Sequence, residues 1–146
     1  MKSSPSDYLK YWKVIRHFFK AKYAVTQSDL DMLLFLYSED YFSKDTFAEY
    51  ANVLSWDSDR FNRLLRDGWI QSFRKNTGRK KALYKISDKT KNMISSMYDI
   101  LNGDEIPTTI YANPMFKRNV KYTDKVYRNM IIEMNKFTRQ RRHLPL

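Results

Sequence analysis

The stretch "RLLRDGWIQSFRKNTGRKKALYKIS", residues 63–87, contains two short apolar segments separated by a polar run. The segments "WIQSF" and "ALYKI" have the composition of β-strands. Gly78, in the run between them, supplies the backbone freedom that the tip of a hairpin needs. Five basic residues gather in the same run, namely Arg74, Lys75, Arg79, Lys80 and Lys81. The sequence therefore predicts a β-hairpin with a strongly positive tip.

Two short helices are predicted just before this hairpin. Ser43 and Ser55 are each placed to cap a helix, because a serine oxygen can accept hydrogen bonds from the backbone N–H groups of a first turn. The second helix carries apolar residues at the spacing of one buried face, and Gly68 is placed to end it. A turn at residues 52–54 joins the two helices, which makes the pair a helix-turn-helix candidate.

Amphipathic helices are also predicted at both ends of the chain. The first starts at Ser4 and Pro5, a helix-start signature, and ends near Tyr23. The last starts near Thr123 and is followed by a basic tail. Apolar residues on both recur at three- and four-residue steps, which is typical of a helix with one buried face. These residues are Tyr8, Tyr11, Trp12, Ile15, Phe18 and Phe19 on the first helix, and Met130, Ile131, Met134 and Phe137 on the last.

Further segments complete the predicted order. An apolar helix is expected to begin after Thr26 or Ser28 and to run to about Ser38, followed by a brief extended stretch, "YF", at residues 41–42. A fifth helix follows Ser87, which can cap it, and stops at Asn102 before a glycine. Residues 104–114 hold two prolines among polar residues, and this composition predicts a linker or arm.

The net charge of the chain is +11, and it is unevenly placed. Acidic residues dominate from Asp29 to Asp59, whereas basic residues dominate from Arg60 to Lys91. A surface that is positive where the hairpin lies attracts a polyanion, such as nucleic acid or an acidic membrane surface. A charged turn that only keeps the hairpin soluble is the alternative.

The predicted order of helix, helix, short strand, helix, helix, strand, basic loop, strand and helix is that of a winged helix-turn-helix domain. Residues 47–90 resemble the MarR-type transcriptional regulators, whose pattern runs from an alanine in the third helix, through a leucine-rich recognition helix and a glycine, to a basic wing. The matching residues are Ala48 or Ala51, Leu64, Leu65, Gly68, Trp69, Ile70, Arg79, Lys80, Ile86 and Ser87. The chain departs from the family at Gly78, where an aspartate usually precedes the wing arginines, and in the acidic opening "SWDSD" of the recognition helix.

The resemblance implies a mostly α fold with a small β-hairpin wing, flanked by N- and C-terminal dimerisation helices. We expect the N-terminal dimerisation helix at residues 1–24 and the winged helix-turn-helix domain at residues 25–102. A linker and the C-terminal dimerisation helix with its basic tail follow at residues 103–146. One winged domain cannot cover the apolar faces of the first and last helices, so these faces meet each other, a second chain, or both. A symmetric homodimer would bury the apolar residues named above and place two recognition helices about one DNA turn apart.

Contacts to double-stranded DNA are expected at the recognition helix and at the wing. Residues near the start of a recognition helix reach base edges in the major groove. The candidates are Ser58, Asp59, Arg60, Asn62 and Arg63. In the wing, Arg79 is expected to enter the minor groove, where negative potential is concentrated. Lys80 and Lys81 are expected to hold phosphates, and Arg74 and Lys75 to add positive charge beside them.

The chain offers little for catalysis or metal binding. It has no cysteine, two histidines and three glycines, and the usual phosphate-loop and metalloprotease motifs do not occur. We therefore expect no enzymatic activity, no cofactor and no metal site. No apolar run approaches the roughly 20 residues that span a bilayer, and the lack of cysteine agrees with a reducing compartment. We expect a cytoplasmic, nucleoid-associated protein, and the abundant lysine, asparagine, tyrosine and isoleucine fit an AT-rich bacterial or viral genome.

The sequence thus predicts a homodimeric transcriptional regulator that binds double-stranded DNA with sequence preference. The alternative is a winged-helix module that binds another protein of a transcription or replication complex, with non-specific or no DNA binding. Many members of the resembled family release DNA when a small-molecule effector binds. No residue of this sequence indicates such a ligand.

Overall fold

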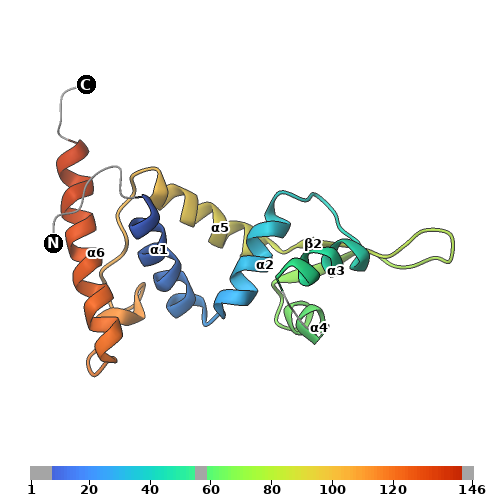
Figure 1. The fold of residues 1–146 in the computed structure, drawn as a ribbon, viewed down its shortest axis with the longest axis horizontal. Helices are drawn as coiled ribbons and strands as arrows, with labels where there is room; N and C mark the ends of the chain where they lie inside the picture. Colours follow the sequence, from blue (N-terminus) through green and yellow to red (C-terminus); the bar gives the residue numbers. More distant parts are fainter. Residues whose placement is uncertain (1–7, 55–58, 143–146) are drawn as a thin grey trace. The chain divides into compact units, whose positions relative to one another are not determined.

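The computed structural model describes residues 8–54 and 59–142, except for the side chains of Tyr8 and Arg142. Within these residues the chain is mostly helical, with a small antiparallel sheet of two strands (Figure 1). Its contacts divide it into two compact units: unit 1 comprises Met1–Val25 and Ser96–Leu146, and unit 2 comprises Thr26–Ser95. The second division falls inside a helix, whereas the boundary predicted from the sequence lies after that helix, at residue 103.

The helices of unit 2 are α2 (Gln27–Tyr37), α3 (Lys44–Val53), α4 (Asp59–Arg66) and the first part of α5 (Asp88–Leu101). Two predicted serine caps are confirmed. Ser43 Oγ accepts from the N–H of Thr46 at the start of α3, and Ser87 Oγ accepts from the N–H of Thr90 at the start of α5. Ser55, the cap predicted for α4, lies outside the described residues.

The sheet of unit 2 consists of β1 (Ile70–Arg74) and β2 (Leu83–Ile86), which pair antiparallel. Phe42 adds a short bridge at the other edge of β2. Its N–H donates to the carbonyl oxygen of Tyr84 at 2.9 Å, and its own carbonyl oxygen accepts from the N–H of Tyr84 at 2.8 Å. The brief extended stretch predicted at residues 41–42 is therefore confirmed at Phe42, whereas Tyr41 is in a bend, and the bridge ties the segment before α3 to the hairpin.

Phe61 of α4 joins the helices of unit 2 to the sheet. Its ring makes edge-to-face contacts with Phe47 of α3 at 5.0 Å and with Tyr84 of β2 at 4.8 Å between ring centroids. Only 6% of Phe61 is exposed, and Leu64, one turn further along α4, is fully buried. A helix of eight residues is too short to be stable alone, so α4 depends on this packing.

Unit 1 contains α1 (Tyr8–Tyr23), the last part of α5, the short 3₁₀ helix η1 (Pro114–Phe116) and α6 (Tyr122–Arg142). Helices α1 and α6 pack against each other. Between them, His17 Nε2 and Asp124 Oδ1 are hydrogen-bonded at 2.9 Å, and the His17 ring stacks on Tyr127 with centroids 3.9 Å apart. These contacts fix the register of α1 along the first turns of α6.

Residues 104–113, part of the predicted linker or arm, contain no helix or strand and belong to unit 1, in which Ile106 and Asn113 are buried. Asn135 of α6 is buried, and its side-chain amide binds both backbone groups of Ile106, donating to the carbonyl oxygen and accepting from the N–H, each at 2.8 Å. Asn113 is fully buried, donates to the Pro107 carbonyl oxygen at 2.8 Å and caps η1. Side-chain amides therefore hold this segment in place.

Half of the apolar residues expected at a dimer interface are buried within the single chain. They are Ile15, Phe18, Phe19, Ile131 and Met134, each at most 8% exposed. Because α1 and α6 pack on each other, these five side chains offer no surface to a second chain. The other members whose side chains are described are half-buried, namely Tyr11, Trp12, Met130 and Phe137.

Replacing Phe61 with alanine is expected to lower the free energy of unfolding by about 3–5 kcal/mol, because the truncation leaves a cavity between α3, α4 and β2. Urea denaturation followed by circular dichroism measures the change. Asn62→Ala, at the exposed neighbouring position, is the control and is expected to stay within about 0.5 kcal/mol of the wild type. A loss below about 1 kcal/mol for Phe61→Ala would contradict the assigned packing.

Replacing Asn135 with alanine is expected to loosen residues 104–113, because each backbone group of Ile106 that loses its partner costs about 1–3 kcal/mol. Hydrogen exchange of the Ile106 amide measures the effect, and the amide should exchange faster in the variant. Asn129→Ala, at an exposed position of α6, is the matched control. Equal protection of the Ile106 amide in both variants would show that other contacts hold the segment.

Candidate nucleic-acid interface

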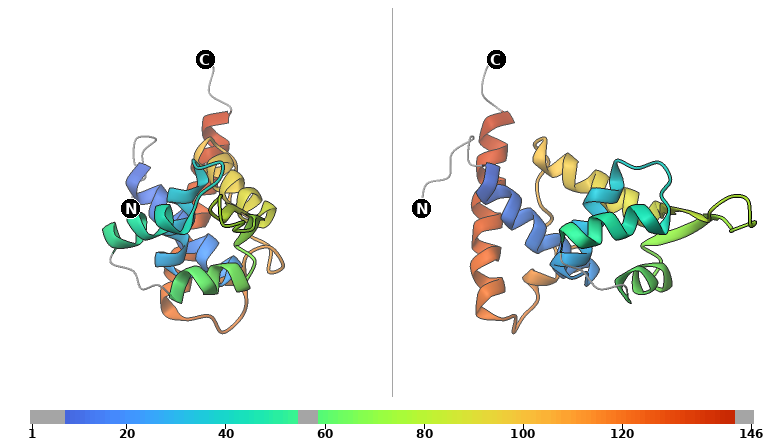
Figure 2. Two further views of the ribbon diagram at one scale, coloured as in Figure 1. Left: turned by 90° about the vertical axis from the view of Figure 1, so that its right-hand side faces the viewer. Right: turned by 45° about the vertical axis from the view of Figure 1, so that its right-hand side comes forward.

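The loop between β1 and β2 extends beyond the helices of unit 2 (Figures 1 and 2). Lys75, Arg79 and Lys80 lie on this loop with exposed side chains, and we call them the tip cations. Gly78 has a φ of +81°, in the left-handed region that glycine favours, and its N–H donates to Asn76 Oδ1 at 2.8 Å. The loop is thus a defined turn that carries positive charge open to solvent.

Two further basic residues of the hairpin, Arg74 and Lys81, make contacts within unit 2. The Arg74 guanidinium donates to the carbonyl oxygen of Lys81 through Nε at 3.3 Å and through an Nη atom at 2.9 Å. Lys81 Nζ donates to the carboxylate of Asp45 in α3, and this hydrogen bond raises the pKa of Lys81 above its ordinary value. These two cations therefore brace the hairpin, and Lys81 remains charged at neutral pH.

The two arginines predicted to read bases, Arg60 and Arg63, are bound to a carboxylate of α2. Asp29 Oδ1 accepts from Arg60 Nη1 at 3.0 Å and from Arg63 Nη2 at 2.7 Å. Asp29 is 6% exposed, and its backbone N–H donates to the cap residue Thr26 at 3.1 Å. One carboxylate at the start of α2 thus fixes α4 through two guanidinium groups.

The remaining predicted readers on α4 lie at exposed positions. Asp59 and Asn62 are both exposed, and Asp59 is in the first turn, where a carboxylate suits the positive end of the helix dipole. Ser58 lies outside the described residues. Of the five predicted readers, two are therefore engaged by Asp29 and two are open to solvent.

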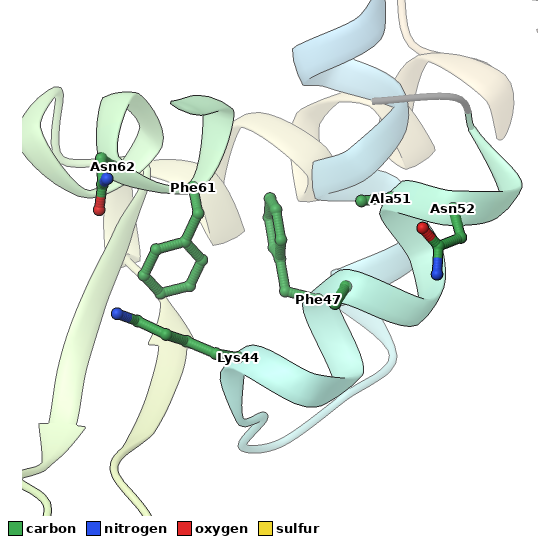
Figure 3. A pocket seen from close by; sticks show the side chains of 7 residues that line it. Lys44, Phe47, Ala51, Asn52, Phe61 and Asn62 are labelled. Atoms are coloured by element: carbon green, nitrogen blue, oxygen red, sulfur yellow. The ribbon is translucent and has the colours of Figure 1, made fainter. Parts of the chain in front are cut away.

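A hollow of about 360 Å³ lies between α3 and α4, beside Asn62. Figure 3 shows Phe47 and Phe61 side by side in it, with Lys44 reaching toward the Phe61 ring. The ammonium of Lys44 is 5.3 Å from the centre of that ring, within the range of a cation–π contact. Asn52 also lines the hollow. Its lining therefore combines aromatic rings with two amides and one cation.

The sequence pattern did not single out Asp29 or Lys44 as site residues. Both lie in the first turns of helices, at positions where polar residues are common and carry no distinctive signal. The one hint for Asp29 is its place at the head of the apolar run "LDMLLFLY", where a buried carboxylate needs a partner. The identity of that partner depends on which helix packs against α2.

Within the described ranges, no group of three or more histidine, cysteine, aspartate or glutamate residues is placed to hold a metal ion. None of the helices in the part of the chain that the structure describes combines the length and apolar character needed to cross a bilayer. No protein-family model matches the chain, and no curated protein matches it either.

Replacing Asp29 with alanine is expected to lower the free energy of unfolding by about 1–3 kcal/mol, because Arg60 and Arg63 lose a nearly buried acceptor. The side chains of Arg60 and Arg63 are 24% and 34% exposed, so solvent keeps the loss of stability below that of a fully buried pair. Urea denaturation measures it. Asp67→Ala is the control, because Asp67 pairs with Arg66 at the exposed surface. Equal losses in the two variants would contradict the role assigned to Asp29.

Proposed function

We propose that unit 2 is a winged helix-turn-helix domain that binds double-stranded DNA, with α4 as the recognition helix and the β1–β2 loop as the wing. The observation that carries the proposal is the set of tip cations, three exposed positive side chains on a loop that extends beyond the helices of unit 2. In this proposal the chain is a homodimeric transcriptional regulator.

The arrangement of unit 2 is compatible with a winged helix. The short helices α3 and α4 are consecutive, the hairpin follows them, and α5 follows the hairpin. Phe42 supplies the edge bridge that this fold places before the helix-turn-helix. The aromatic contacts of Phe61 support the same assignment, because they hold α4 against both α3 and the hairpin.

The tip cations suit phosphate binding. Several cations held close together neutralise neighbouring phosphates and release the condensed counterions, which is a large part of DNA affinity. Gly78 turns the chain between Lys75 and Arg79, so the three cations share one loop. Arg79 is proposed to enter the minor groove and Lys80 to contact a phosphate beside it.

Base reading is proposed for Asn62 rather than for the arginines of α4. Arg60 and Arg63 hold Asp29, so a contact with guanine would require them to leave that carboxylate. Asn62 is exposed beside the aromatic hollow, and asparagine can form two hydrogen bonds with adenine in the major groove. The apolar lining contributed by Phe47 and Phe61 suits contact with a thymine methyl group.

A homodimer is proposed through unit 1. Tyr11 and Trp12 of α1 and Phe137 of α6 are half-buried, and Ile132 of α6 is 42% exposed. A two-fold axis would bring this partly exposed apolar surface of one chain against the same surface of the other. The buried members of the apolar stripes serve the contact between α1 and α6 instead.

A second candidate function is recognition of another protein by the same surface. It is favoured by the exposed carboxylate of Asp59 at the start of α4, next to arginines that are already bound to Asp29. A carboxylate at that position is repelled by phosphates, whereas a basic patch on a partner protein would accept it. The salt dependence of DNA binding separates the two functions.

Arg79→Ala is expected to weaken binding to every duplex sequence and to lower the slope of log affinity against log salt by about one unit, because the variant lacks one of the positive charges that neutralise the phosphates beside the groove. Fluorescence anisotropy with a labelled blunt duplex over a range of salt concentrations measures the slope. Arg118→Ala, which removes an exposed cation of unit 1, is the matched control and should leave the slope unchanged.

Asn62→Ala is the complementary variant. It is expected to relax sequence preference in a selection from random duplexes while leaving the salt slope of the wild type intact, because a base contact carries no phosphate charge. Duplex binding that does not respond to salt, or equal slopes for Arg79→Ala and Arg118→Ala, would remove the DNA assignment and favour a protein partner.

A further inference from the structure

Tyr41 and Phe73 form an exposed aromatic pair on the sheet of unit 2. Their rings stack with centroids 4.1 Å apart and an angle of 26° between the planes. Tyr41 is 48% exposed and Phe73 is 49% exposed, so about half of each side chain is open to solvent. Tyr41 directly precedes the Phe42 bridge and Phe73 is on β1, so the pair spans the narrow sheet.

The pair lies on the sheet face that does not meet the core. Phe42 is 2% exposed, and Tyr84, its bridge partner, contacts Phe61 inside unit 2. Successive residues of a strand point to opposite faces, so Lys85 is on the face opposite Tyr84. The contacts of the Phe73 ring with Lys85 and with Tyr41 place the pair on that same face. The open face of an antiparallel sheet is usually polar. Two half-exposed rings there form an apolar surface of the kind that a binding partner covers.

Positive charge lies beside this pair, near Phe73. The ammonium of Lys85 is 6.0 Å from the centre of the Phe73 ring. Arg74 and Lys75 follow Phe73 along the chain and lead into the tip cations. Asp40, which precedes Tyr41, is also exposed and carries negative charge. The cations therefore border the pair where β1 continues into the hairpin loop.

We propose that Tyr41 and Phe73 form a stacking platform for the unpaired bases of single-stranded DNA next to a duplex held by the wing. Aromatic side chains beside cations are the general means of binding single strands, because every base has a face that can stack and every nucleotide adds a phosphate. The bases of an intact duplex are stacked on one another, so a platform of this kind selects unpaired ones. The positive border favours this polyanion over an apolar or basic protein surface.

The inference rests on the proposed function for the duplex held by the wing, but its ligand is different. The platform requires a base, whereas the tip cations require only phosphates. A single-stranded tail beside a duplex therefore gains affinity from the platform, and a blunt duplex does not. Because of this difference, the stacking platform and duplex binding by the wing can each be disproved without the other.

The test compares three DNA molecules that share one duplex: a blunt form, a form with a tail of about ten thymidines, and a form with an abasic tail of the same length. Fluorescence anisotropy at near-physiological salt measures each affinity. The wild type is expected to bind the thymidine tail roughly 5- to 100-fold more tightly than the abasic tail, which keeps the phosphates but offers no base. Tyr41→Ala and Phe73→Ala should each remove most of this ratio, and Phe73→Trp should retain it.

Tyr111→Ala is the matched control, because Tyr111 is a fully exposed tyrosine of unit 1, and it should leave the ratio unchanged. Circular dichroism confirms that each variant is folded. Equal affinity of the wild type for the two tails overturns the proposal. An equal loss of affinity for blunt and tailed DNA in Phe73→Ala also overturns it, because the pair would then only support the wing. Tighter binding of the same tail made of RNA overturns it as well. A tail preference that depends on Phe73 while the blunt duplex shows no binding supports the platform and removes the double-stranded function.

Discussion

The carboxylate of Asp29 and the two guanidinium groups that it binds set the position of α4, and much of unit 2 follows from that position. A helix of eight residues cannot be stable alone, so it must be held from both sides. Phe61 holds its inner face against Phe47 and Tyr84, while Arg60 and Arg63 attach its other side to α2. Because β1 begins four residues after α4 ends, the direction of the hairpin depends on the same contacts.

The cations of the hairpin loop fall into two groups, those that bond within unit 2 and those that remain exposed. Arg74 and Lys81 bond to the hairpin backbone and to Asp45, and they hold the loop in one orientation. The tip cations lie beyond them and remain exposed. In the proposed DNA complex, a loop whose base is fixed would lose less conformational entropy on binding, so Arg74 and Lys81 would contribute to affinity without touching the DNA. The proposed platform of Tyr41 and Phe73 would use the same fixed hairpin.

In unit 1, the apolar faces of α1 and α6 have to be buried by few residues. Helices α1 and α6 cover each other, and residues 104–113 are held beside them by Asn135 and Asn113. Amides are suited to this task, since one side chain can both donate to and accept from the backbone of an irregular segment. The apolar area left at half-buried positions is what the proposed dimer would use.

The sequence by itself determined the α-helices and strands of the part of the chain that the structure describes, because their signals are local, but it did not predict η1. The spacing of apolar residues marked the helices, Ser43 and Ser87 marked two helix starts, and the aromatic segments around Gly78 marked the hairpin. Only the tertiary structure decided which charged side chains are paired with one another. Asp29 lies 31 residues before Arg60, and no local pattern predicts a bond across that separation. The apolar stripes show the same limit, since an amphipathic helix has the same sequence pattern whether its own chain or a partner covers it.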